Sequence, residues 1–389
     1  MNTIASILDG LASVGLALVL VQLAAACARR REPAATGRRT DISILKPLCG
    51  LDDELAENLA SFAALEGARY EVLLGVRDVD DAAYPVALGA CARRPDVFRL
   101  VVQEGSPGEN PKVNQLVTLA AAARYDLLLV SDSNVRVDPG YLREVAAAFA
   151  DPTVALATSP IVGSDGPGLG ARMDALPLTG SVGPGVIAAK RLARQDVTIG
   201  KSMAIRVRDL EAIGGFEAVA DVLAEDQVIG RLVRRRPERR VVLLGTPVVN
   251  VSRTRTARSF FERYRRWSVI HRQIVPLPLY AGELLLQPTA LALLAAILAP
   301  GAATLGAFVA ALLLRAAFDQ LAALRLRGEG LSWLTIALGP VKEALLALAW
   351  CQGLVSDVVV WRGKRLRVLP GTRLAAAPGR SRTPQEARR

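Results

Sequence analysis

The chain has 389 residues, of which 51% are hydrophobic and 5% aromatic, and its formal net charge is +11 at pH 7. This length predicts one large domain with a sizeable core plus additional segments. A single histidine, His271, excludes a metal site built from a cluster of histidines. The basic excess is typical of proteins that bind a nucleic acid, an anionic membrane surface or a phosphorylated substrate. Without C-x-x-C spacing, the cysteines are expected to be small buried residues in a reducing compartment, not a disulfide framework or a zinc site: Cys27, Cys49, Cys91 and Cys351.

Residues 1–31 are predicted to form an uncleaved membrane anchor. The run from Ile4 onward contains one acidic residue, Asp9, and is otherwise about as long and apolar as a bilayer crossing requires. Three arginines at positions 29–31 follow this run, whereas a secretory signal peptide carries its positive charge before the apolar stretch. The positive-inside bias then predicts that the arginine-bearing end lies in the cytoplasm.

Residues 40–272 have the pattern of an α/β domain, in which short apolar runs alternate with stretches of helical spacing. This alternation predicts a mostly parallel sheet covered on both faces. Because such sheets bind ligands at the carboxyl ends of their strands, polar residues that close a strand are the candidates for chemistry. The predicted elements are strands at 42–45, 70–76, 98–103 and 125–132, and helices at 52–65 and 113–124.

Residues 276–362 are predicted to be transmembrane or interfacial helices. Segments 277–300 and 301–324 are each long and apolar enough to span a bilayer. Segment 331–361 contains Lys342, Glu343 and Asp357 and has basic residues on both sides. An interfacial or re-entrant arrangement is therefore favoured over a full crossing.

Two further segments are strongly basic. Residues 231–240, RLVRRRPERR, are either a patch for anionic lipid headgroups or a plain solvated face. Residues 370–389 are rich in Arg, Ala and Pro and are predicted to form a disordered tail.

Acidic residues follow two of the predicted strands. Asp78 and Asp80 come directly after the strand at 70–76, where a solvated turn is an equally good interpretation. Asp132 begins the sequence Asp-Ser-Asn at the end of the strand at 125–132. A carboxylate there is well placed to ligate a divalent cation that bridges the phosphates of a nucleotide, although an Asx-turn is the structural alternative.

Two later motifs also combine charge with an apolar setting. Glu225 and Asp226 either begin a solvated helix or hold a carboxylate in a cleft for chemistry. The sequence RYRRW, from Arg263 to Trp267, offers an arginine pair and an aromatic ring that can grip a diphosphate. The alternative for RYRRW is a basic-aromatic belt where a helix meets lipid.

The order of these motifs resembles the inverting family-2-like glycosyltransferases of GT-A fold. It is more closely similar to the ceramide glucosyltransferase family, family 21, and its bacterial relatives. The similarity extends from about Ile42 to Trp267 through GVRDVDD, NPKVNQL, VSDSNV, IGKSM, LAEDQVIG and RYRRW, and VVVWRGKRLRV is similar as well. One departure is Gln227, because many relatives carry an aromatic residue there, and this change puts the identity of the acceptor in question.

The resemblance implies a role for each matching residue. Asp226 would be the general base, with Glu225 shaping the site beside it. Asp132 would coordinate a divalent cation, Mg²⁺ or Mn²⁺, together with the diphosphate, and Asp78 would lie near the uracil base. The residues implied to bind the donor are Asp78, Asp80, Lys112, Asn110, Asn114, Asp132, Gly200, Lys201, Ser202, Arg263, Arg266 and Trp267, with Met203 in the same loop as Gly200.

The implied reaction is transfer of a sugar from a UDP-sugar to a membrane lipid alcohol, most simply ceramide. One base without a second nucleophilic carboxylate predicts a single displacement with inversion. The expected setting is a bacterial inner membrane, with several crossings and the catalytic domain in the cytoplasm; no nucleic acid partner is expected. A hopanoid-linked glycosyltransferase, a processive polysaccharide synthase and an inactive nucleotide-sugar binding protein are the alternatives.

Overall fold

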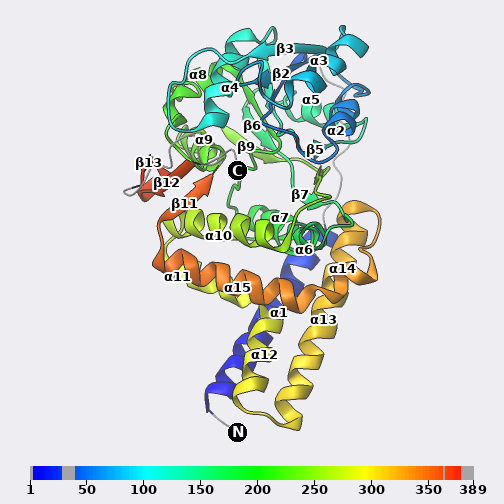
Figure 1. Ribbon diagram of the computed structural model, residues 1–389, viewed down its shortest axis with the longest axis vertical. Helices are drawn as coiled ribbons and strands as arrows, with labels where there is room; N and C mark the ends of the chain where they lie inside the picture. Colours follow the sequence, from blue (N-terminus) through cyan, green and yellow to red (C-terminus); the bar gives the residue numbers. More distant parts are fainter. Residues whose placement is uncertain (1–2, 29–39, 362–363, 378–389) are drawn as a thin grey trace.

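The computed structural model describes residues 3–28, 40–361 and 364–377, so the arginines at 29–31 lie outside the described residues. Its largest sheet has seven strands in the order β3-β2-β1-β4-β8-β6-β9 (Figure 1). β1 to β4 run parallel, as do β6 and β9, and β8 is antiparallel to both of its neighbours. The predicted α/β fold with a mostly parallel sheet is confirmed. The strands are β1 (Ile42–Pro47), β2 (Tyr70–Val76), β3 (Phe98–Val102), β4 (Leu127–Val130), β6 (Val154–Thr158), β8 (Met203–Arg206) and β9 (Arg240–Leu243).

Alternate residues of the strands face two separate hydrophobic cores, because successive side chains of a strand point to opposite sides of the sheet. Ile44 and Leu74 pack with the helices of one face, and Leu45 and Leu73 pack with those of the other. Both faces are therefore covered, which explains why these strands are nearly continuous apolar runs. The first face carries α2 (Leu55–Phe62), α3 (Tyr84–Arg93) and α5 (Tyr141–Ala148), and the second carries α4 (Pro111–Ala122), α8 (Val207–Glu211) and α9 (Glu225–Arg234).

A smaller sheet and a group of helices connect this domain to the apolar helices. The smaller sheet has the strand order β5-β10-β7, with β5 at Val135–Arg136, β10 at Val248–Asn250 and β7 at Ile161–Gly163. Next to it, a single helical run is formed by α6 (Leu169–Pro177), the π-helical turn η1 (Leu178–Val182) and α7 (Gly183–Arg191). The long helix α10 (Ala257–Ile274) crosses the molecule beneath the seven-stranded sheet (Figure 1).

Three apolar helices project away from the sheets on the far side of α10 (Figure 1). Two of them, α1 (Thr3–Cys27) and α13 (Ala302–Arg327), are long and apolar enough to cross a membrane. The third, α12 (Pro288–Leu298), packs between them and shares their hydrophobic contacts. The start of α1 and the turn between α12 and α13 lie at the same end of this bundle.

Segment 277–300, which the sequence shows to be long and apolar enough to span a bilayer, is not one continuous helix. The segment is divided into α11 (Leu277–Gly282), a 3-10 turn η3 (Glu283–Leu286) and α12, with a bend of 77° between the two parts. The break falls at Gln287, whose φ of −115° and ψ of 54° are not helical. Gln287 precedes Pro288, and a proline ring disfavours the helical conformation of the residue before it. If the bent pair forms one crossing, the described residues contain up to three candidate spans.

Segment 331–361 packs along α10 and does not project with α1, α12 and α13. It forms α14 (Trp333–Ala337), α15 (Gly339–Val355) and β11 (Val358–Trp361). In Figure 1, α15 runs across the top of the bundle and side by side with α10. This course agrees with the interfacial arrangement favoured by the sequence, which stays a prediction.

Four buried charged side chains join α13 and α15 to the domain. Arg315 of α13 contacts Asp319 at 2.7 Å and Glu343 of α15 at 3.4 Å, and Lys342 lies 3.5 Å from Glu343. Arg315 also donates to the carbonyl of Gly180 in η1 at 3.3 Å. Buried charges persist only when they are paired, so this cluster fixes the two helices against η1.

The prediction of disorder from residue 370 is wrong for the part that the structure describes. Pro370–Thr372 form a 3-10 turn and Leu374–Ala376 form β13, which completes an antiparallel sheet with β11 and β12 (Lys364–Val368). Alternating apolar side chains of this small sheet pack against Val269 of α10 and against Leu223. Residues 378–389 lie outside the described residues.

The expectation that the cysteines are buried is also wrong. Cys27 and Cys351 are exposed, and Cys49 and Cys91 are half-buried. The two exposed cysteines lie at the end of α1 and on α15, on apolar helices whose outer faces pack against no other part of the described chain.

The basic segment 231–240 makes ion pairs within its own domain. Arg236 and Arg239 contact the buried carboxylate of Asp209 at 3.2 and 2.9 Å. Arg240 contacts Asp151 at 2.9 Å. Of the two alternatives for this segment, a patch for lipid headgroups and a solvated face, these ion pairs favour the solvated face.

Candidate active site

The structure brings Asp132, Lys112 and Lys201 together at the carboxyl end of β4. Asp132 follows β4, and Lys201 precedes β8, whose antiparallel register pairs Met203 with Val130 and so places the start of β8 beside the end of β4. The two carboxylate oxygens of Asp132 lie 2.9 Å from Nζ of Lys112 and 2.8 Å from Nζ of Lys201. The strand-end carboxylate is thus held between two ammonium groups.

Lys112 also links this carboxylate to the Glu225-Asp226 pair at the start of α9. Its Nζ lies 2.8 Å from Oε1 of Glu225. Asp226 accepts from the backbone N–H of Gly200 at 2.6 Å and from that of Gln227 at 2.8 Å. A Cβ atom at Gly200 would come within 3.0 Å of the Asp226 carboxylate and of Nζ of Lys112, so the close approach of the loop requires glycine here.

Burial and charge give Asp226 the properties of a base near neutral pH. Its pKa is raised to about 6, mainly by burial and next by the adjacent Glu225 carboxylate, against the opposing effect of Lys112. Glu225 is buried, whereas Asp226 retains partial exposure. The pKa of Asp132 is lowered, since the two lysines outweigh the effect of burial. Two neighbouring carboxylates are therefore pushed in opposite directions, the pattern that separates a proton acceptor from a permanently charged group.

Lys46 is a residue of this site that was missed in the sequence. It is fully buried in β1, donates to the backbone carbonyl of Asp132 at 2.8 Å, and lies 3.7 Å from the ring centre of Phe62. Burial lowers its pKa to about 7, although the negative charge of Asp132 opposes this. A lysine inside the apolar run ISILKPL was the available signal, because lysine is rarely buried unless it is paired.

Asn110 and Asn114 support the site without facing a donor. The side chain of Asn110 caps α4 by accepting from the backbone N–H groups of Lys112 and Val113, and it donates to the carbonyl of Val222. Asn114 accepts from and donates to the backbone of Gly108. These bonds occupy both carboxamides, so their contribution is to place Lys112 and not to bind the donor directly.

Ser202 likewise faces the protein interior. Its hydroxyl lies 2.6 Å from the hydroxyl of Tyr141, and its carbonyl accepts from Thr158 at 2.8 Å. Ser202 and Met203 are both buried. The part of this loop that reaches the carboxylates is Gly200-Lys201.

Asp78 and Asp80 are not brought into this cluster by any contact of the described residues. Both are exposed beyond the carboxyl end of β2, where Asp78 accepts from the backbone N–H of Asp80 at 3.1 Å and lies 3.7 Å from Arg77. β1 separates β2 from β4 in the sheet. The two acids therefore lie at the same edge of the sheet as Asp132 but one strand further away.

The RYRRW motif lies on α10, and its first arginine faces a buried carboxylate. Arg263 donates to Asp174 at 2.7 Å, and the guanidinium lies 4.8 Å from the ring centre of Trp267. Arg266 and Trp267 are partly exposed on the same helix. The expectation that Arg263 grips a diphosphate directly does not match this geometry, since its side chain is buried and already paired.

Gln227 occupies the position where many relatives carry an aromatic residue. Its side chain donates to the backbone carbonyl of Thr198 and is thereby tied to the loop that carries Gly200 and Lys201. The residue at which the sequence departs from the family pattern therefore ties the start of α9, next to Asp226, to the loop that precedes β8.

The residues present fit a cation that is shared between one carboxylate and a substrate. Among the described residues, no group of three or more His, Cys, Asp or Glu side chains could hold a metal ion. Asp132 offers one carboxylate, and Mg²⁺ commonly takes one or two carboxylates and completes its coordination with phosphate oxygens and water. The site suits that arrangement and not an all-protein metal cage.

Comparison with known proteins identifies the family of the chain. A family model described as glycosyl transferase family 21 matches residues 7–374. Ceramide glucosyltransferase 1 of Caenorhabditis elegans is 27% identical over 237 residues, which are 60% of this chain and 50% of that protein. Ceramide glucosyltransferase 3 of the same organism is 28% identical over 237 residues, 60% of this chain and 51% of that protein. The chain spans about half the length of these curated relatives.

Solved structures with a related chain course include a mannosyltransferase from Pyrobaculum calidifontis in complex with GDP-Man and Mn²⁺. It is 16% identical, has a TM-score of 0.48, and the match covers 90% of this chain and 98% of that one. This chain has a mostly parallel α/β sheet with carboxylates after its strand ends. It belongs to glycosyl transferase family 21, whose model covers nearly the whole chain.

Activity is expected to fall as the pH decreases through about 6. Asp226 must be ionised to accept a proton, and protonation removes the base. Glu225→Gln should move this acidic limb to lower pH. The substitution removes a negative charge that raises the pKa of Asp226, while the positive charge of Lys112, which lowers that pKa, remains. The measurement is kcat/KM for sugar transfer between about pH 5 and pH 8. An acidic limb that stays in place in the variant would remove Glu225 from this role.

The C-terminal sheet is expected to be required for activity, because it holds the segment before the paired acids. The backbone N–H of Leu223 donates to the carbonyl of Thr372 at 2.9 Å, and that of Leu374 donates to the carbonyl of Asp221 at 2.7 Å. A chain ending after Leu369 should lose roughly 10²-fold in kcat, since small misplacements of catalytic groups cost that much. A chain ending after Ala377 is the control, and equal kcat values for the two chains would contradict the prediction.

Proposed function

We propose that this protein transfers a sugar from a UDP-sugar to a membrane lipid alcohol, most simply ceramide, by a single displacement with inversion. The observation that carries the proposal is the partly exposed Asp226, whose pKa is raised to about 6 mainly by burial, beside the lysine-bound Asp132. One group can accept a proton, and the other stays charged where a diphosphate would bind. A transfer of a sugar from a nucleotide to an alcohol needs both.

Asp226 removes the proton from the acceptor hydroxyl as that oxygen attacks the anomeric carbon. The bond from this carbon to the diphosphate breaks, and the negative charge that develops on the leaving diphosphate lies near Lys112 and Lys201. Preorganised positive charge at such a position is often the largest contribution to catalysis. The proposal assigns one base and no nucleophilic carboxylate, so the displacement is single and inverts the anomeric carbon.

A divalent cation, Mg²⁺ or Mn²⁺, would be held by Asp132 and would add positive charge to the diphosphate. Lys112 and Lys201 then orient Asp132 and bind the phosphate oxygens that the cation does not. The relative from Pyrobaculum calidifontis is described in complex with Mn²⁺, which supports testing this ion first.

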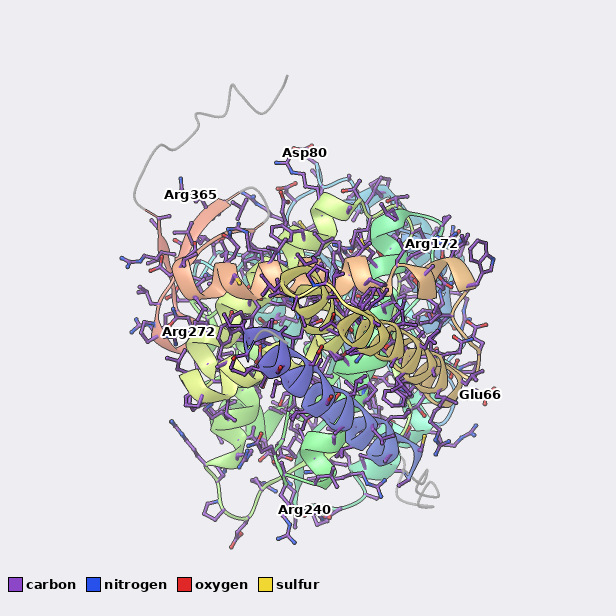
Figure 2. The ribbon with its side chains drawn as sticks, turned by 90° about the horizontal axis from the view of Figure 1, so that it is seen from below. Glu66, Asp80, Arg172, Arg240, Arg272 and Arg365 are labelled. Atoms are coloured by element: carbon purple, nitrogen blue, oxygen red, sulfur yellow. The ribbon has the colours of Figure 1, made fainter. Side chains whose placement is uncertain are left out.

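The acceptor is proposed to come from a bilayer. Seen from below in Figure 2, α1, α12 and α13 occupy the centre, and the labelled charged residues lie around them in projection. Large apolar side chains such as Ile7, Val14, Ile297 and Leu313 are exposed on these three helices. Exposed apolar surface of this extent indicates contact with lipid. The ceramide glucosyltransferases among the relatives support ceramide within this class of acceptors.

Purified protein in detergent with Mn²⁺ should label one lipid when it is given radioactive UDP-glucose and ceramide. A parallel reaction with a hopanoid extract tests the other lipid acceptor. A labelled glycolipid from ceramide supports the proposal, and label only from the hopanoid extract or only in polymer would replace ceramide by that acceptor. Release of UDP without any labelled lipid would refute the lipid acceptor.

We further propose that the chain resides in the bacterial inner membrane with the domain at 40–272 in the cytoplasm. A reporter that is active only in the cytoplasm should give a signal when it is fused after Ala377. The same reporter inserted at Gly301, in the turn between α12 and α13, should be silent if these helices cross the bilayer. A cytoplasmic signal at both positions would mean that the bundle enters the membrane without crossing it.

A further inference from the structure

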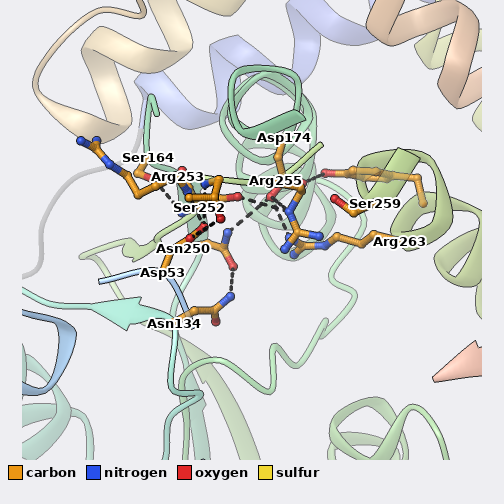
Figure 3. A network of polar contacts seen from close by, with 12 residues as sticks. Asp53, Asn134, Ser164, Asp174, Asn250, Ser252, Arg253, Arg255, Ser259 and Arg263 are labelled. Atoms are coloured by element: carbon orange, nitrogen blue, oxygen red, sulfur yellow. Dashed lines mark hydrogen bonds and ion pairs between the residues drawn. The ribbon is translucent and has the colours of Figure 1, made fainter. Parts of the chain in front are cut away.

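A continuous run of polar contacts leads from the candidate active site to α10. Lys201, which binds Asp132, donates to Oδ1 of Asn134 at 2.6 Å. The amide of Asn134 donates to Oδ1 of Asn250 at 3.3 Å, and the amide of Asn250 lies 3.5 Å from the Asp174 carboxylate. Figure 3 shows Asn134, Asn250 and Asp174 of this run, with Arg263 of α10 next to Asp174.

The run reaches α10 through Asp174 of α6, which contacts two residues of α10. Its Oδ2 accepts from Arg263 at 2.7 Å, and its Oδ1 accepts from the hydroxyl of Tyr264 at 3.0 Å. Arg255, just before α10, lies 3.7 Å away. Asp174 is 1% exposed and Asn250 is fully buried. A buried carboxylate that accepts several hydrogen bonds, one of them from an arginine, fixes the orientation of its own side chain and of the arginine.

We propose that Asp174 is a positioning residue for sugar transfer, which sets α10, through Arg263, relative to Lys201 and Asp132. This inference rests on the proposed function of the site at Asp132 and Asp226. Arg263 is buried and faces Asp174, so its contribution to the reaction is indirect. Asp174 fixes the guanidinium of Arg263, which lies 4.8 Å from the ring centre of Trp267. It thereby fixes the partly exposed face of α10 that carries Arg266.

The geometry explains why a carboxylate is needed at this position. An amide at residue 174 would leave the Arg263 guanidinium without a counterion inside a buried polar shell, which is strongly unfavourable. The cation would then be drawn toward the nearest other anion. The contact run joins Asp174 to Lys201 through Asn250 and Asn134, so a displaced Arg263 would also disturb the side chains that contact the active site. The spacing between α10 and the donor loop would change as a result.

The test compares Asp174→Asn with Asp209→Asn. Asp209 of α8 is equally buried, at 1% exposure, and also binds two arginines, Arg236 and Arg239, but lies outside the contact run. The readout is UDP released from UDP-glucose by hydrolysis, in which water accepts the sugar, normalised to the folded protein, so it does not depend on which lipid is the acceptor. Asp174→Asn should lower kcat at least about tenfold with a donor KM within about threefold of the wild type. Asp209→Asn should leave both quantities within about twofold.

A second measurement separates positioning from loss of folding. Hydrogen exchange of the backbone of α10 should rise in Asp174→Asn relative to the wild type, while that of α9 stays unchanged. The double variant Asp174→Asn with Arg263→Gln should be no slower than Arg263→Gln alone, since both remove one interaction. A kcat within twofold of the wild type, unchanged exchange in α10, or additive losses in the double variant would each overturn the proposal. Failure of glycolipid formation with normal UDP release would refute the proposed acceptor and leave this inference standing.

Discussion

Asp226→Asn is expected to lower the rate of sugar transfer by roughly 10²- to 10⁴-fold, the range that a general base contributes. The substitution keeps the size of the side chain and removes its ability to accept a proton. Donor affinity should remain close to that of the wild type, because Asp132, Lys112 and Lys201 are unchanged. The measurement is the initial rate of glycolipid formation together with UDP affinity by titration calorimetry in detergent.

Glu217→Gln provides the matched control for this variant. Glu217 begins the 3-10 helix η2 (Glu217–Val219), is exposed, and lies in the same part of the chain as Asp226. It should transfer sugar at the wild-type rate. If Asp226→Asn retained near-normal transfer, the role of base would pass from Asp226 to another group.

Asp132→Ala is expected to weaken UDP binding at least about tenfold in the presence of Mn²⁺ and to leave it undiminished without the metal. The carboxylate is the group proposed to hold the cation, so its loss removes the metal-dependent part of the affinity. The same loss leaves Lys112 and Lys201 without the partner that lies 2.9 and 2.8 Å away, so their charges become available to phosphate. UDP affinity should be titrated for wild type and variant, each with Mn²⁺ and with a chelator.

The control for this variant is Asp138→Ala, an exposed carboxylate beyond β5 in the same region of the chain. Its UDP affinity should match that of the wild type under both conditions. Equal affinities for wild type and Asp132→Ala, with and without the metal, would refute the cation site at Asp132. Weaker binding of Asp132→Ala under both conditions would show that the lysines need Asp132 for their placement.

The sequence by itself determined the class of fold and the position of the main candidates. Mostly apolar runs at 70–76 and 98–103 correspond to β2 and β3 almost residue by residue, although β2 is buried and β3 at the edge of the sheet is only partly buried. Parallel strands end at one edge of the sheet, so a carboxylate that closes β4 was predictable as a site residue. The pair Glu225-Asp226 became a candidate only through the resemblance to a family, because two acids at this place equally suit a solvated helix start.

Local patterns could not determine the side-chain partners, because these come from distant parts of the chain. The pairing of Asp132 with Lys201 depends on the antiparallel register of β8, and that of Arg263 with Asp174 depends on the packing of α10 against α6. Asn110 looked like a donor ligand in the sequence, yet the folded chain uses both ends of its carboxamide.

The tertiary structure also decided the fate of the segments that composition described incorrectly. Residues 370–376 look like a polar tail, but their few apolar side chains complete a sheet against Leu223 and α10. The segment at 277–300 has the hydropathy of one span, but Pro288 breaks it. Composition and periodicity predict which conformation a segment adopts in an average environment. Contacts between distant residues decide which environment it meets, and those contacts exist only in the folded chain.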